Sequence, residues 1–158
     1  MKTTIVCIGL LSAAIAAPAL AGPPSPPDLG GTYRVRGECY DRTTEGAYVP
    51  CVAWNALTLT RDGVAGRYRF ALETNMFATT QGGCSLEGAM TLERGQSGWS
   101  LVAERDETNA CPIRFEIGRR ALTLTLPENE RDAESCRRYC SSNASLATDP
   151  FPVRSRKK

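Results

Sequence analysis

Between Val64 and Leu126, apolar and polar residues alternate in one short run after another. In one such run, Tyr68, Phe70 and Leu72 alternate with charged or small residues. A period of two is what a β-strand with one buried face requires, because successive side chains point to opposite sides of the strand. Runs of this kind begin near Thr32, Tyr48, Val64, Cys84, Trp99, Cys111 and Ala121. The pattern therefore predicts a sheet of short strands.

Polar turns that contain glycine separate these runs, as at residues 61–63. Regular spacing of strands by such turns favours an antiparallel meander. We predict an all-β fold of seven to eight strands in one domain, residues 32–153, closed into a small barrel or a two-layer sandwich because closure protects the strand edges. A short helical turn is expected around residues 132–139, and Leu146 or Phe151 is expected to return to the sheet as a final edge strand.

Both ends of the chain carry segments outside this domain. Residues 1–21 combine a positive start, an apolar run and a small-x-small pattern at residues 19–21, which together predict a cleaved secretory signal peptide. The proline-rich residues 22–31 predict an extended leader that trails in solvent. Residues 154–158 form a basic tail, for which we expect a frayed, solvated terminus. After cleavage we expect no transmembrane segment and a periplasmic or secreted product.

The cysteine content fits export. Cys7 lies in the signal peptide, and six cysteines remain: Cys39, Cys51, Cys84, Cys111, Cys136 and Cys140. An even number in a chain sent to an oxidising compartment predicts three disulfides. Cys39 and Cys51 flank a loop, so they are expected to pair across a hairpin, with a contribution of roughly 2–3 kcal/mol in the chain-entropy model.

The other four cysteines allow three connectivities. We favour Cys84 with Cys111, because both take the inward positions of nearby strands, which leaves Cys136 with Cys140. Crossed pairings that attach the C-terminal segment to the sheet remain open.

The composition excludes several kinds of chemistry. The chain contains no histidine, so Ser-His-Asp and Cys-His catalytic arrangements are impossible. Without imidazole, and with thiols oxidised on export, zinc or copper binding is not expected, and we predict no cofactor. Paired carboxylates remain available for a glycosidase-like mechanism, but no local arrangement selects two of them. The formal net charge of +2 gives no strong field for nucleic acid.

Two groups of side chains are candidates for binding. The predicted outward faces carry Arg34, Arg36, Arg67, Arg69 and Arg114, interleaved with Glu73 and Glu116. Arginines on one sheet face could grip a carboxylate or phosphate, although cross-strand ion pairing explains the same residues and is the interpretation we favour. Trp54, which belongs to an apolar pattern with Cys51, Leu57 and Leu59, and Trp99 could line a ligand cavity, but more often such residues fill a core, and both interpretations place them inward.

A group of small exported proteobacterial proteins ends in a CxxYC-type segment followed by a short Ala-Ser-Phe/Leu strand. The chain resembles this group, over roughly residues 64–153, in the segments Cys84-Ser-Leu-Glu-Gly, Cys111-Pro-Ile-Arg-Phe, Arg120-Ala-Leu-Thr-Leu, Cys136-Arg-Arg-Tyr-Cys140 and Ala144-Ser-Leu. Ser141 stands where the group usually has glycine. Because the group's function is largely unassigned, the resemblance implies the fold more than an activity.

Ser97, Gly98 and Trp99 also resemble, more weakly, the loop that periplasmic lysozyme inhibitors insert into the lysozyme cleft. Those inhibitors are small disulfide-bonded β-barrels, so the resemblance implies a candidate partner loop at these three residues. A plain hairpin turn explains them as well.

Export, crosslinks and the missing catalytic groups together predict a non-enzymatic binding protein. Its most concrete form is an inhibitor of a lysozyme-like cell-wall hydrolase. One alternative is a lipocalin-like carrier of a small apolar ligand, which requires an open barrel interior. The other is a structural envelope protein. The expected partner is a protein or a small apolar ligand rather than nucleic acid.

Overall fold

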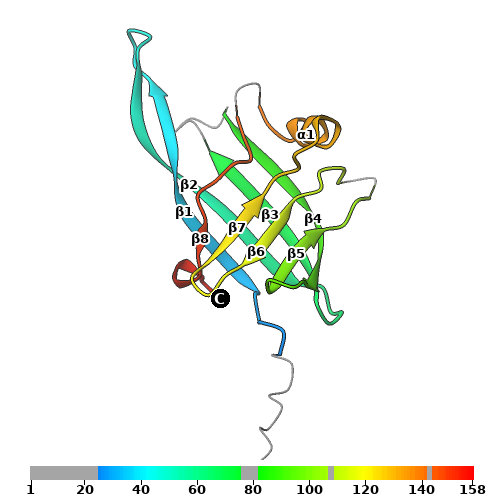
Figure 1. The fold of residues 1–158 in the computed structure, drawn as a ribbon. Coiled ribbons are helices and arrows are strands. Elements are labelled where there is room, and N and C mark those ends of the chain that lie inside the picture. Colours follow the sequence, from blue (N-terminus) through cyan, green and yellow to red (C-terminus); the bar gives the residue numbers. More distant parts are fainter. Residues whose placement is uncertain (1–24, 76–81, 107–108, 142–143) are drawn as a thin grey trace, which may run out of the picture.

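The computed structural model describes residues 25–75, 82–106, 109–141 and 144–158. Eight strands form one sheet: β1 (Gly31–Arg42), β2 (Tyr48–Arg61), β3 (Arg67–Asn75), β4 (Gly83–Arg94), β5 (Trp99–Ala103), β6 (Arg114–Ile117), β7 (Ala121–Thr125) and β8 (Phe151–Pro152). Each strand pairs antiparallel with the next along the chain, and the sheet curls into a nearly closed barrel (Figure 1). The predicted all-β meander is therefore confirmed, in its barrel form. The predicted signal peptide lies outside the described residues.

The barrel interior is filled by the apolar side chains at alternate positions of the strands. On β3, for example, Tyr68, Phe70 and Leu72 are buried while their neighbours are exposed or half-buried. The largest fully buried side chains include Tyr33, Phe115, Phe151, Leu57, Leu59, Leu72, Leu86, Met90, Leu101, Ile113 and Leu122. Phe115 and Phe151 meet edge to face, with ring centroids 6.2 Å apart. The alternation in the sequence thus corresponds to one continuous core.

The two ends of the chain close the barrel, which corrects two predictions. Thr32 on β1 and Lys157 exchange two backbone hydrogen bonds of 2.9 Å, so the basic tail is a pairing partner of β1 and not a frayed terminus. A 3-10 turn, η1 (Val153–Ser155), carries the chain from β8 to this contact. The leader does not simply trail in solvent either, because Leu29 is buried in the core. The proline-rich composition concealed this anchor, since a single apolar residue carries it.

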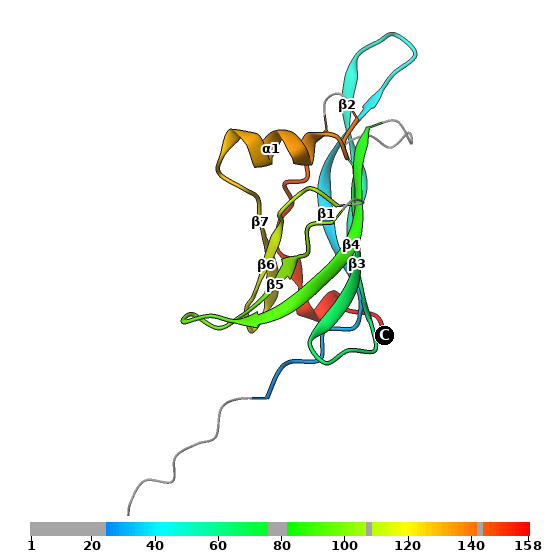
Figure 2. The ribbon, with the colours of Figure 1, turned by 90° about the vertical axis from the view of Figure 1, so that its right-hand side faces the viewer.

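The mouth of the barrel is crossed by α1 (Glu130–Arg137), the helical turn that the sequence predicted (Figure 2). Asn129 caps it by accepting a hydrogen bond of 2.9 Å from the Asp132 amide. The segment around α1 carries two disulfide partners. Cys136 bonds to Cys111, and Cys140 bonds to Cys84.

The favoured pairings of Cys84 with Cys111 and Cys136 with Cys140 are therefore wrong, and the crossed alternative holds. The pairing of β4 with β5 begins only at Met90, so β5 does not reach the level of Cys84, whose backbone bridges to Cys140 there. Cys111 lies in the segment between β5 and β6 and bonds to Cys136 of α1. Cys136 and Cys140 sit at the end of α1, where each reaches the sheet below. The third pairing, Cys39 with Cys51, is confirmed.

β1 and β2 extend past the rest of the barrel as a two-stranded ribbon (Figures 1 and 2). β2 pairs with β3 only from Ala56 onward, whereas its pairing with β1 continues to Tyr48. We call residues 36–54 the arm. Cys39 and Cys51 lie directly opposite each other in it, so their disulfide staples its two strands.

Within the described residues, no helix is long and apolar enough to cross a membrane. Three disulfides are typical of a protein from an oxidising compartment.

Candidate binding surfaces

The arm carries exposed apolar side chains on its outward face. In the β1–β2 register, Trp54 lies opposite Arg36, Val52 opposite Glu38, Pro50 opposite Tyr40 and Tyr48 opposite Arg42. Directly opposed residues of an antiparallel pair point to the same side, and alternate residues along a strand do so too. Four apolar side chains therefore share one face, and their exposed fractions are 42% for Tyr40, 64% for Tyr48, 56% for Val52 and 53% for Trp54. We call these four residues the arm face.

Trp54 was expected inward, and this prediction is wrong. It has the opposite parity to Leu57 and Leu59 on the same strand, which are buried. The sequence does contain a signal for this arrangement, because apolar residues occupy both parities between Tyr48 and Trp54. A strand with one buried face would alternate there.

The base of the arm is fixed to the barrel. The Asn75 side chain at the end of β3 donates a hydrogen bond of 2.8 Å to the Trp54 carbonyl. The Asn75 amide donates one of 3.0 Å to Oδ1 of the buried Asn55. Together with the Cys39–Cys51 staple, these bonds hold the arm face in one orientation relative to the barrel.

The candidate partner loop at Ser97, Gly98 and Trp99 forms the tight turn between β4 and β5. The Gly95 amide donates to the Gly98 carbonyl at 2.8 Å, and Gly98 has a φ of 141°, which favours glycine. Ser97 is exposed, whereas Trp99 is half-buried, with the Arg94 guanidinium 5.7 Å from its ring centroid. The loop is at the end of the barrel opposite α1 and the arm (Figure 2).

The predicted outward arginines fall into two groups. Arg67 makes a two-pronged contact with Glu104, at 3.0 and 2.8 Å, and Arg114 lies 3.9 Å from both Glu93 and Glu116. Ion pairing thus accounts for these two arginines, although only Glu93 lies on another strand. Within the described part of the chain, no ion pair is formed by Arg34, Arg36 or Arg69, and all three are exposed.

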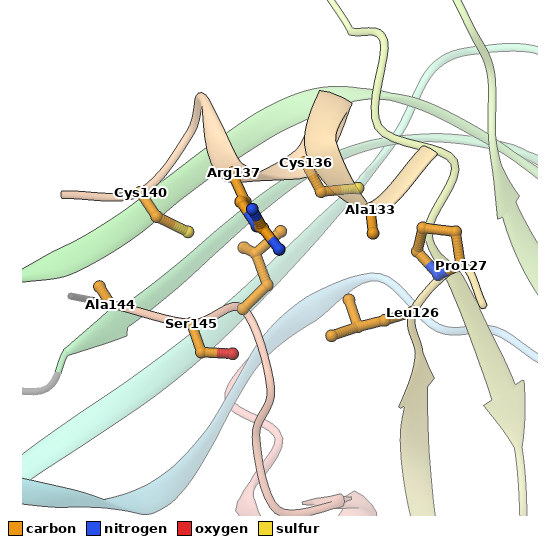
Figure 3. Close-up of a pocket in the computed structure, with 9 residues that line it drawn as sticks. Leu126, Pro127, Ala133, Cys136, Arg137, Cys140, Ala144 and Ser145 are labelled. Carbon is orange, nitrogen blue, oxygen red and sulfur yellow. The ribbon is translucent and has the colours of Figure 1, made fainter. Parts of the chain in front are cut away.

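A small apolar pocket lies beneath α1 at the barrel mouth (Figure 3). Its volume is about 230 Å³. Ala133, Cys136 and Arg137 of α1 form one side, and Leu126, Pro127, Cys140, Ala144, Ser145 and Leu146 complete the lining. Arg137 bonds to Glu134 at 2.9 Å and is largely exposed. The pocket is at the surface of the core and not inside the barrel, so Trp54, Trp99 and Phe70 do not line it.

The carboxyl groups whose pKa is shifted in the structure are stabilised as anions. Hydrogen bonds from Arg67 and then Thr91 lower the pKa of Glu104, and those from Asn129 and Arg105 lower the pKa of Asp132. A hydrogen bond from Arg61 is the main cause of the lowered pKa of Asp28. A carboxyl group that acts as a catalytic general acid requires a raised pKa instead. Among the described residues, no group of three or more Cys, Asp and Glu side chains could hold a metal ion.

No protein-family model, curated protein or solved structure matches the chain. Its function is therefore inferred from the surfaces themselves.

Proposed function

We propose that the chain is a non-enzymatic binding protein of the periplasm or the extracellular space, and that it engages a protein partner through the arm face. One observation carries this proposal. Four apolar side chains, three of them aromatic, are exposed side by side on a part of the sheet that contributes no residue to the main core cluster.

Contiguous exposed apolar surface is a feature of interaction sites, because its exposure costs solubility without contributing to the core. Trp, Tyr and Arg are also the residues that contribute most to protein interfaces, and Arg36 and Arg42 lie opposite Trp54 and Tyr48. The disulfide staple holds the arm in one conformation before binding. Less conformational entropy is then lost when a partner docks.

Inhibition of a lysozyme-like cell-wall hydrolase is the most concrete form of this proposal. A narrow two-stranded ribbon that projects from a compact body can enter an open cleft. The tip of the arm, residues 43–47, is polar and is exposed or half-buried, and the arm face lies behind it along the ribbon. The arm and the loop at Ser97 lie at opposite ends of the barrel, so variants can test the two surfaces separately.

The test is inhibition of lysozyme by the purified, oxidised protein, together with capture of hydrolases from periplasmic extract. The arm variant Tyr48→Ser/Trp54→Ser is expected to bind about 30-fold more weakly, the loss of one typical hot-spot contact. Val64→Ser is the matched control, because Val64 is 61% exposed but lies outside the arm. Loss of binding in Ser97→Arg alone would place the interface on the β4–β5 loop. No inhibition and no captured protein at micromolar excess would contradict the proposal.

The pocket beneath α1 supports a second candidate, a carrier of a small apolar ligand. The filled barrel interior leaves no lipocalin-like site among the described core residues, but the pocket could hold a short acyl chain or an apolar ring. Ala144→Trp is expected to fill the pocket and abolish binding of a fluorescent fatty-acid probe, whereas Ala65→Trp, in an exposed turn, leaves binding unchanged. Absence of both a partner and a ligand would favour the structural envelope role.

A further inference from the structure

A second hollow lies on the outside of the barrel, at the seam where the C-terminal segment pairs with β1. Its volume is about 630 Å³. Five basic side chains line it, namely Arg34, Arg61, Arg156, Lys157 and Lys158, against one acidic side chain, Asp28. We call this hollow the seam pocket.

A hollow of similar size elsewhere on the barrel does not show this excess of positive charge. A hollow of similar volume, about 660 Å³, lies beside α1 at the other end of the barrel. It contains equal numbers of basic and acidic side chains: Arg105, Arg131 and Arg138, and Asp106, Asp132 and Glu134. The arginine-rich composition of the chain therefore does not by itself produce an unbalanced pocket.

Asp28 neutralises only part of the excess. Its carboxylate lies 3.0 Å from Arg61, 3.1 Å from Arg156 and 3.7 Å from Lys158. Arg156 has a structural role, because its guanidinium also donates to the Gly30 carbonyl at 2.7 Å and to the Asp28 carbonyl at 2.6 Å. One carboxylate cannot balance five cations.

Arg34 and Lys157 remain directed at the open part of the pocket. Lys157 lies opposite Thr32, so both side chains point outward, and Arg34 follows Thr32 on the same face of β1. Both residues are exposed, and within the described part of the chain neither forms an ion pair. The Thr32 and Thr58 hydroxyls, 3.1 Å apart, add polar groups to the lining of the pocket.

The backbone around these residues is fixed. Gly31 has a φ of 140°, and a Cβ at this position would lie only 2.7 Å from the Lys157 carbonyl oxygen. The Arg34 amide donates to the Ser155 hydroxyl at 3.0 Å. The pocket is thus framed by β1 and the C-terminal segment, which cannot separate without breaking the barrel closure.

We propose that the seam pocket binds a phosphate-type oxyanion, with Arg34 and Lys157 as its main ligands. A guanidinium offers two parallel donors that match the oxygens of a phosphate, and an ammonium adds a point charge. Threonine hydroxyls can donate to the remaining oxygens. A dianion suits a pocket whose excess charge exceeds what one carboxylate neutralises. The site is distinct from the arm face and independent of the function proposed for it.

Titration with sodium phosphate, against sodium chloride at equal ionic strength, tests this proposal. Saturable changes in the amide resonances of Thr32 and Ser155 are expected in the wild type. Arg34→Gln/Lys157→Gln should weaken phosphate binding at least tenfold, because it removes both cationic ligands. The barrel should still fold, because both substitutions leave the backbone pairing intact. The control Arg131→Gln/Arg138→Gln removes the same charge at the other end of the barrel. Equal weakening in both variants would overturn the proposal. Shifts that do not saturate would overturn it too if the vesicle experiment also finds no binding.

Vesicles distinguish the sources of the phosphate group. If phosphatidate in phosphatidylcholine vesicles binds the wild type and free phosphate competes, a lipid headgroup and a soluble phosphate share the site. Binding of vesicles alone, lost in Arg34→Gln/Lys157→Gln but not in the control, assigns the site to a headgroup. Binding of free phosphate alone assigns it to a soluble phosphate compound. Absence of binding to both probes contradicts the proposal.

Discussion

β1 and β2 pass through two different environments, and their outward faces differ accordingly. Within the barrel body their inward residues, such as Leu57 and Leu59, are buried, and their outward residues are threonine, alanine and arginine. In the arm the same two strands carry aromatic and valine side chains outward, although no residue of the arm belongs to the main core cluster. Apolar residues in the body therefore account for stability, whereas those in the arm face require another explanation. We infer that this explanation is binding.

The largest expected difference between the two regions is in the free energy of unfolding. Phe115 is fully buried, so Phe115→Ala should lower it by about 3–5 kcal/mol through lost transfer energy and a residual cavity. Trp54→Ala removes a side chain that is 53% exposed and should change it by only about 0.5 kcal/mol. Urea unfolding followed by far-UV circular dichroism measures both. Comparable losses would show that the arm face contributes to the fold and would weaken the binding proposal.

The disulfide in the barrel body should likewise contribute more to the free energy of unfolding than the disulfide in the arm. Cys84 and Cys140 are 56 residues apart, and removing this bridge by alanine substitution should cost about 4 kcal/mol in the chain-entropy model. Cys39 and Cys51 are 12 residues apart, for which the same model gives about 3 kcal/mol. Because the arm extends beyond the barrel, removing its disulfide should mainly allow the arm to open locally and should affect global unfolding less.

Amide hydrogen exchange separates local from global effects of these pairs. Cys39→Ala/Cys51→Ala should speed exchange in residues 36–54 and leave the amides of β3 and β4 nearly unchanged. Cys84→Ala/Cys140→Ala should speed exchange throughout the barrel. A global effect of the arm disulfide would mean that the arm and the body unfold as one unit.

Much of the fold could be predicted from the sequence because a period of two survives along almost every strand. The number of strands, the meander order, the helical turn and the return of Phe151 all follow from local patterns. The pairing of Cys84, Cys111, Cys136 and Cys140 could not be predicted. Parity places a side chain on a face of the sheet, but it does not tell how far apart two strands lie or what crosses the barrel mouth.

The binding surfaces were harder to predict for related reasons. The inward placement of Trp54 followed its apolar character, whereas its parity on β2 points it outward, between the buried residues Ala53 and Asn55. The charged tail gave no local sign that Lys157 pairs with Thr32, because backbone pairing needs no particular side chain. The seam pocket joins residues more than 120 positions apart and therefore has no sequence motif.

At the seam, a charged side chain acts as part of the structure. Arg156 is only 16% exposed and donates hydrogen bonds to two backbone carbonyls. Arg156→Gln should lower the free energy of unfolding by about 1.5–3 kcal/mol, the range for hydrogen bonds to charged groups. Arg154→Gln, the matched control on an exposed neighbour, should change it by less than about 0.5 kcal/mol. An equal effect of both would mean that net charge, rather than the Arg156 contacts, stabilises the seam.

The smallest expected effect is the pH dependence that Asp28 gives to the same seam. Its pKa is held below the ordinary value, first by the hydrogen bond from Arg61 and then by those from the Gly30 amide and Arg156. A carboxyl group whose pKa is lower in the folded state stabilises that state above its unfolded pKa, near about 4, and loses this contribution as the pH falls toward the folded value. The stability difference between wild type and Asp28→Asn should therefore be constant from about pH 8 to pH 5 and shrink below about pH 4. Glu45→Gln, which removes a carboxyl group at the exposed tip of the arm, is measured alongside as the control. A difference that persists unchanged in acid would mean that Asp28 acts through its shape and backbone contacts, and the carboxylate would no longer be a measure of the seam pocket's positive field.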